Sequence, residues 1–126
     1  ESHCYAYMFT GCSGLTTLPA NLLPVTTLYN SCYWGMFENC TSLTTAPDLP
    51  AQTLVGSCYY LLFDGCTKLS SVTCLATNIS ANDCLTYWLK GAGTEAETRT
   101  LHVKSTMKTE DWKLPDTPTW TITGDQ

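Results

Sequence analysis

The stretch CYWGMFENCTSLTTAPDLP at residues 32–50 decides the fold, because the chain repeats it. Related stretches begin at Cys4, Cys58 and Cys84, so successive starts are 28, 26 and 26 residues apart. The first nine residues of the four units read CYAYMFTGC, CYWGMFENC, CYYLLFDGC and CLTYWLKGA. A period of this size is typical of proteins in which one supersecondary unit stacks on the next. The sequence therefore predicts a stack of four similar units.

The nine residues that open each unit are predicted to form a two-turn helix. With the leading Cys as position 0, apolar residues fall at positions 0, 1, 4, 5 and 8, which is one face of a helix. Position −1 holds Ser31, Ser57 and Asp83 before the last three units, and these residue types cap helix N-termini. Position 7 holds residues that tolerate the left-handed conformation at a helix end: Gly11, Asn39, Gly65 and Gly91.

A short strand is expected after each predicted helix. It opens at Leu15, Leu43 and Leu69 and continues through Thr-rich sequence, which favours strands. Pro19 and Pro47 limit any ladder pairing to a few residues. Each unit is thus predicted to contain a helix, a bend, a short strand and a return loop.

The pattern CYxxMFxxCxxLTTAPxLP resembles the BspA-like leucine-rich repeats, a surface-protein family of gut and oral anaerobes. The resemblance covers residues 4–91 and implies an α/β fold, a right-handed leucine-rich-repeat solenoid of about three and a half turns over residues 1–93. The tail at residues 94–126 is similar to the closing segment of such proteins and is expected to form a strand–helix–strand cap. Thr73 in place of Pro and Ala92 in place of Cys depart from the pattern.

The cysteines are predicted to form two ladders of buried thiols. Two Cys of one unit are eight helical residues apart, about 12 Å along the axis, whereas a disulfide needs Cα atoms within about 7 Å. Neighbouring helices would pack about 8–10 Å apart, which is again too far. The ladder residues, expected to be free and reduced, occupy position 0 and position 8: Cys4, Cys32, Cys58 and Cys84, then Cys12, Cys40 and Cys66. Cys74 lies outside both ladders.

Composition and spacing argue against several function classes. A net charge of −5 without a basic run argues against nucleic acid as a partner. No apolar run approaches the roughly 20 residues of a membrane-spanning helix. A C-x7-C repeat with only His3 and His102 does not resemble a zinc site. No set of nucleophile, base and orienting group is visible, so we expect no catalytic residue, metal or cofactor.

Aromatic residues at positions 2 and 3 of the units are the candidate binding residues. The Tyr and Phe residues at positions 1 and 5 are expected in the core. The outer set, on the face that a short helix turns outward, is Tyr7, Trp34, Tyr60 and Tyr87. Either these rings are partly buried against the adjacent unit, or they form a contact surface for a glycan or a protein.

The resemblance implies a non-enzymatic module that mediates protein–protein interaction or adhesion at a bacterial cell surface. Its partners would be host or matrix proteins, and we expect a monomer. The first unit begins at Cys4, close to the start of the given sequence. We therefore expect that this chain is the C-terminal part of a longer protein, which is attached to the cell surface through its N-terminal part. Two alternatives stay open: a carbohydrate-binding accessory module of a glycan-utilisation system, and a structural spacer without its own ligand.

Overall fold

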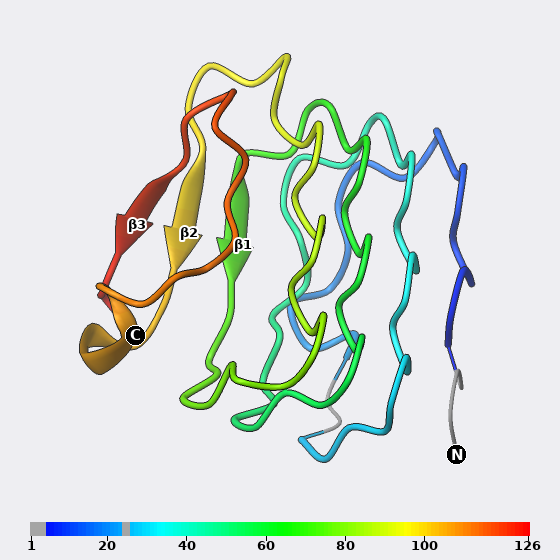
Figure 1. The fold of residues 1–126 in the computed structure, drawn as a ribbon. Coiled ribbons are helices and arrows are strands. Elements are labelled where there is room, and N and C mark those ends of the chain that lie inside the picture. The colour runs from blue at the N-terminus through cyan, green and yellow to red at the C-terminus, as the bar shows by residue number, and fades with distance from the viewer. Residues whose placement is uncertain (1–4, 24–25) are drawn as a thin grey trace.

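The computed structural model describes residues 5–23 and 26–126 and shows the repeat units lying side by side (Figure 1). Alternate backbone N–H groups of one unit donate to carbonyls of the next. Tyr33 N lies 3.1 Å from Cys58 O, and Gly35 N lies 2.9 Å from Tyr60 O. The 26-residue period of the sequence is therefore present in the structure as a ladder of hydrogen bonds between units.

The predicted fold class, an α/β leucine-rich-repeat solenoid with a helical cap, is wrong. Within residues 5–23 and 26–126 there is no α-helix, and the strands are short. The strands β1 (Ser71–Thr73), β2 (Thr100–His102) and β3 (Thr121–Thr123) form a small parallel sheet in the order β1-β2-β3. In the earlier units the expected strand is reduced to isolated parallel bridges, such as the one between Thr17 and Thr45.

The segments predicted as helices are chains of tight turns. In the second unit, Trp34 N donates to Ser31 O at 3.3 Å and Glu38 N donates to Gly35 O at 3.1 Å, so these bonds span three residues. An α-helix bonds each N–H four residues back along the same segment. Here every second N–H donates instead to a carbonyl of the next unit. Every fourth residue is left-handed, with φ of 59° at Ser31, 60° at Gly35 and 59° at Asn39, which an α-helix of L-residues cannot accept.

The residues interpreted as helix caps are the left-handed residues of these turns. Position 7 has positive φ in every unit, as the Gly and Asn residues there predicted: Gly11, Asn39, Gly65 and Gly91. Position −1 was expected to be an extended N-cap, but Ser31, Ser57 and Asp83 have φ of 59°, 53° and 54°. The apolar spacing at positions 0, 1, 4, 5 and 8 therefore follows a four-residue turn and not a 3.6-residue helix.

Rows of equivalent side chains fill the interior. Phe37 stacks between Phe9 and Phe63, with centroids 5.6 and 5.7 Å away and ring planes 7° apart in both pairs. In a second row Tyr59 lies between Tyr33 and Trp88, at 6.3 and 6.4 Å. The hydrogen-bond ladder sets these distances, because equivalent residues of adjacent units lie one above the other.

The C-terminal segment joins the stack through the sheet and through tryptophan. The short helix predicted in it is a single 3-10 turn, η1 (Ser105–Met107). β1 belongs to the third unit and pairs with β2, so the sheet continues from the repeats into this segment. Trp112 closes the second row, because its ring lies 6.2 Å from Trp88 and its carbonyl accepts the Trp88 indole N–H at 2.8 Å.

Among the described residues, no helix has the length and apolar character that crossing a membrane would require.

Candidate functional site

The four outer aromatic residues form one continuous row, which we call the aromatic row. Ring centroids are 6.4 Å apart between Tyr7 and Trp34, 4.7 Å between Trp34 and Tyr60, and 6.2 Å between Tyr60 and Tyr87. The rings lie this close because positions 2 and 3 of successive units are brought together by the hydrogen-bond ladder. The row crosses all four units along the stacking direction.

The ends of the aromatic row are more exposed than its middle. Tyr7 is 49% exposed and Tyr87 is 54% exposed, whereas Trp34 and Tyr60 are half-buried. The Lys90 ammonium lies 5.2 Å from the centroid of the Tyr87 ring, so a cation covers part of that end. The middle rings therefore pack against their neighbours and the end rings face solvent, and a contact surface for a glycan or a protein stays a prediction.

A polar ladder at position 6 accompanies the turns that carry the aromatic row. Glu38 and Asp64 occupy this position in the second and third units, and both are partly buried. Burial raises the pKa of the Glu38 carboxyl, and the charge of Asp64 raises it further. Burial also raises the pKa of Asp64, while Lys90 acts in the opposite direction. Two partly buried carboxylates therefore lie at equivalent positions of adjacent units.

The prediction of buried, reduced thiol ladders needs two corrections, at Cys12, which is exposed, and at Cys32. Free thiols are found at Cys12, Cys40, Cys58, Cys66, Cys74 and Cys84. Cys32 is disulfide-bonded, so the expectation of a reduced thiol is wrong there. Cys4 lies outside the described residues.

The buried thiols serve as core side chains. In the position-8 ladder, Cys40 Sγ donates to Phe9 O at 3.1 Å and Cys66 Sγ donates to Phe37 O at 3.0 Å. Burial raises the pKa of Cys58, Cys66 and Cys74 to about 12. These three thiols therefore stay protonated at neutral pH, and a protonated thiol is a poor nucleophile.

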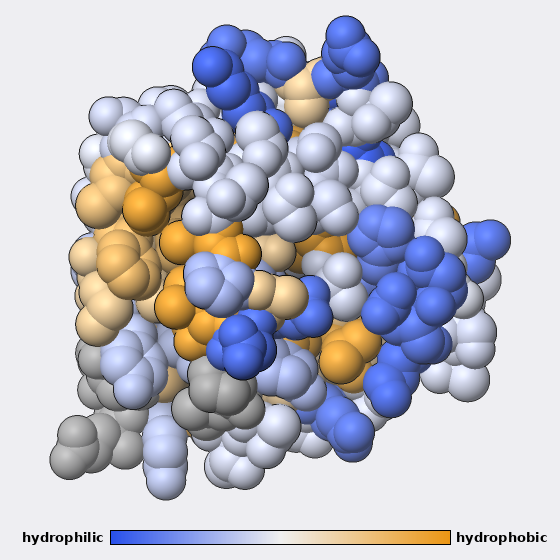
Figure 2. Space-filling view, turned by 180° about the vertical axis from the view of Figure 1, so that it is seen from behind, coloured by the Kyte–Doolittle hydropathy of each residue, from blue (hydrophilic) through white to orange (hydrophobic). Residues whose placement is uncertain are grey.

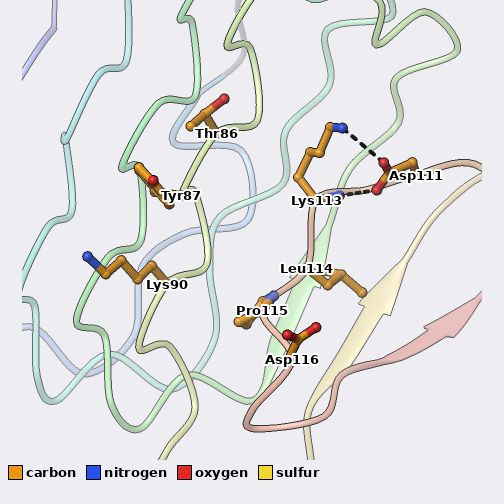
Figure 3. A pocket seen from close by; sticks show the side chains of 8 residues that line it. All are labelled: Thr86, Tyr87, Lys90, Asp111, Lys113, Leu114, Pro115 and Asp116. Atoms are coloured by element: carbon orange, nitrogen blue, oxygen red, sulfur yellow. Dashed lines mark hydrogen bonds and ion pairs between the residues drawn. The ribbon is translucent and has the colours of Figure 1, made fainter.

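A cavity of about 510 Å³ lies at the Tyr87 end of the aromatic row (Figure 3). Thr86, Tyr87 and Lys90 of the fourth unit form one wall, and residues 111–116 of the C-terminal segment form the other. Lys113 Nζ pairs with Asp111 Oδ2 at 2.9 Å, and this hydrogen bond lowers the pKa of Asp111. This cavity could not be predicted from the sequence, because no motif links the two segments that enclose it.

A second surface of apolar side chains lies at the first unit, at the other end of the stack (Figure 2). Tyr5 is 40% exposed and Met8 is 53% exposed. Both residues line a smaller cavity of about 200 Å³ together with Leu22, Leu23 and Met36. The first unit therefore exposes apolar surface of the type that the second and third units bury against each other.

Within residues 5–23 and 26–126, no three His, Cys, Asp or Glu side chains lie close enough together to hold a metal ion. His102, in β2, pairs instead with Asp125, at 2.9 Å between Nδ1 and Oδ2.

The chain matches no protein-family model, no curated protein and no solved structure. The resemblance to BspA-like repeats, based on the repeat motif, therefore stays a prediction.

Proposed function

We propose that this chain is a non-enzymatic binding module, located outside the cell or on its surface, that contacts a host or matrix protein through the aromatic row. The observation that supports this most is the continuity of the row, with centroid distances of 6.4, 4.7 and 6.2 Å across four units. Exposed Tyr and Trp side chains on a rigid frame are the residue types that dominate protein interfaces.

The surroundings of the row favour a protein partner. Interfaces between proteins combine an apolar centre with a polar rim. The half-buried rings of Trp34 and Tyr60 provide the centre, and the partly buried carboxylates of Glu38 and Asp64 lie at position 6 of the same two units. A partner with basic or hydroxyl side chains around an apolar contact fits this arrangement.

A second candidate function is that of a carbohydrate-binding accessory module. It is supported by the exposed rings at the ends of the row, because a sugar ring stacks on one open aromatic face. Tyr7 is 49% exposed and Tyr87 is 54% exposed. A structural spacer without a ligand is the remaining alternative.

An array of extracellular-matrix proteins and glycans tests these proposals. Tyr7→Ala, Trp34→Ala and Tyr60→Ala should each weaken binding to a protein on the array by about tenfold or more, as expected for interface hot spots. Tyr29→Ala is the matched control, because Tyr29 is 56% exposed and lies outside the row. Thermal unfolding of each variant shows whether it is folded.

Each outcome of the array has a defined meaning. Protein binding that the row variants lose and the Tyr29 variant keeps supports the adhesive function. Binding to glycans and to no protein would contradict the adhesive function and support the carbohydrate-binding function. Binding that none of the row variants changes, or no binding at all, overturns the role of the row.

A further inference from the structure

Side chains at position 6 of the units contact the positions that carry the aromatic row. In the first unit, Thr10 Oγ1 donates to Gly35 O at 2.7 Å, so this side chain reaches the second unit one residue after Trp34. In the fourth unit, the Lys90 ammonium lies 5.2 Å from the centroid of the Tyr87 ring. At both ends of the stack, the side chain at position 6 therefore lies beside the row.

The two middle units carry carboxylates at position 6. Glu38 belongs to the second unit and Asp64 to the third unit, which also carries Tyr60. Because the units share one conformation, the contacts made by position 6 at the two ends place both carboxylates near the Tyr60 ring. This ring lies 4.7 Å from that of Trp34, and all four side chains are partly exposed. A ligand can therefore reach two carboxylates and two aromatic rings at the same place.

The carboxylates of Glu38 and Asp64 have no ion-pair partner within residues 5–23 and 26–126, where both ion pairs lie in the C-terminal segment. Every Lys and Arg occurs at or beyond Lys68, so the second unit contains none. Burial raises the pKa of both carboxyls, and the charge of Asp64 raises that of Glu38 further. A cation between the two carboxylates would relieve this repulsion.

We propose that the middle of the aromatic row binds a Lys or Arg side chain of the partner protein, whose cation lies beside the Tyr60 ring and pairs with Glu38 and Asp64. This inference rests on the proposed function and names the chemistry of the partner. A cation is attracted by the ring face and by the carboxylates at once. The contact of Lys90 with Tyr87 is the same interaction made within the chain. The net charge of −5 also favours a basic partner.

Two capped pentapeptides test the site: Gly-Lys-Gly-Lys-Gly, and Gly-Gln-Gly-Gln-Gly as its uncharged match. Nuclear magnetic resonance follows the indole N–H of Trp34, because the other three Trp side chains are buried. The lysine peptide should shift this signal and should bind about tenfold more tightly than the glutamine peptide, since it adds a cation–π contact and a charge-assisted hydrogen bond.

Matched variants locate the cation. Glu38→Gln and Asp64→Asn should each weaken binding of the lysine peptide by about threefold to fivefold. Burial disfavours both charges, so these variants should fold at least as well as the parent chain. Glu97→Gln is the control, because it removes the same charge from an exposed residue of the C-terminal segment.

Equal binding of the two peptides would overturn the cation site, and so would equal losses in Glu38→Gln and Glu97→Gln. The array judges the proposed function separately. If a protein on it binds Glu38→Gln and Asp64→Asn normally but not the variants of the aromatic row, the row mediates adhesion and the cation site is wrong.

Discussion

The repeat units and the C-terminal segment are held together in different ways. The repeats align through a backbone ladder, and equivalent side chains such as Phe37 and Phe63 then stack at 5.7 Å. The C-terminal segment continues this backbone pairing mainly in the β1-β2-β3 sheet, and elsewhere individual side chains attach it. Trp88 and Trp120 each donate an indole N–H to a backbone carbonyl across the boundary, at 2.8 Å to Trp112 and 3.4 Å to Ala92. The repeats are therefore aligned by their backbone throughout, whereas the C-terminal segment combines backbone pairing in the sheet with contacts of a few tryptophans.

The largest effect is expected in the repeats, at Phe37. This side chain is fully buried and stacks on both neighbours, so Phe37→Ala should lower the free energy of unfolding by about 3–5 kcal/mol. Chemical denaturation measures the loss. Phe9→Ala is the control, since Phe9 is partly exposed and has one stacking neighbour among the described residues. If Phe9→Ala lowered the free energy of unfolding as much as Phe37→Ala, stacking in the row would not be the source of stability.

Trp112→Ala tests the attachment of the C-terminal segment. Removing the ring leaves Trp88 without its neighbour and should cost about 3 kcal/mol. Hydrogen exchange should become faster over residues 100–126, while amides of the second and third units stay protected. If exchange became equally fast in the repeats, the two regions would form one cooperative unit.

Alkaline pH should destabilise the repeats through their buried thiols. The pKa of Cys58, Cys66 and Cys74 rises from 9.0 to about 12 on folding, because burial disfavours the thiolate. Because the pKa is higher in the folded protein, the protonated thiols contribute their full stabilisation below pH 9. This contribution is lost as the pH rises from 9 to about 12. Each thiol should lower the free energy of unfolding by about 1.4 kcal/mol per pH unit in this window.

Cys66→Ala is the test of this pH dependence. When denaturation is measured at each pH, the free energy of unfolding of the variant should decline less steeply above pH 9. The difference in slope should equal the contribution of one thiol. Cys12→Ala is the matched control, because Cys12 is an exposed thiol at the same position of the first unit. Equal slopes in the two variants would contradict a buried Cys66 thiol.

The smallest effect is expected from the backbone of the turns. Gly65 has a φ of +77°, and a Cβ there would collide with Asn39 Oδ1, so Gly65→Ala should cost about 1–2 kcal/mol. Gly14→Ala should leave the melting temperature nearly unchanged, because no atom lies within 4 Å of its Cβ position. Similar melting temperatures for the two variants would show that the left-handed turns contribute little to stability.

The repeat period and the left-handed residues at position 7 could be predicted from the sequence, but the local conformation could not. Apolar residues at positions 0, 1, 4, 5 and 8 fit a helix face and also a chain of four-residue turns. Ser31 and Asp83 are suitable both as N-caps and as left-handed residues, with φ of 59° and 54°. Gly35, in the middle of a predicted helix, was the signal against it, because glycine is unfavourable in helix interiors.

The outward set of aromatic residues could be chosen from the sequence, whereas the cavity at the Tyr87 end of the row could not. Tyr7, Trp34, Tyr60 and Tyr87 recur at positions 2 and 3, so stacking alone brings them together. The cavity lies between two groups of residues that share no repeat, motif or spacing: Thr86, Tyr87 and Lys90 on one side, and the segment of residues 111–116 on the other. The packing of Trp112 on Trp88 and the pairing of β1 with β2 bring these segments together.

The direction of the ladder in the turns gives the stack an electric polarity. From Tyr5 to Gly65, alternate N–H groups all donate toward the next unit, so their peptide dipoles add along the stacking axis. The partial positive charge therefore accumulates at the fourth unit, as it does at the N-terminus of an α-helix. Asp111 and Asp116 lie opposite that end. Lys113 pairs with Asp111 there, so Asp116 is the carboxylate of this wall that complements the field of the turns.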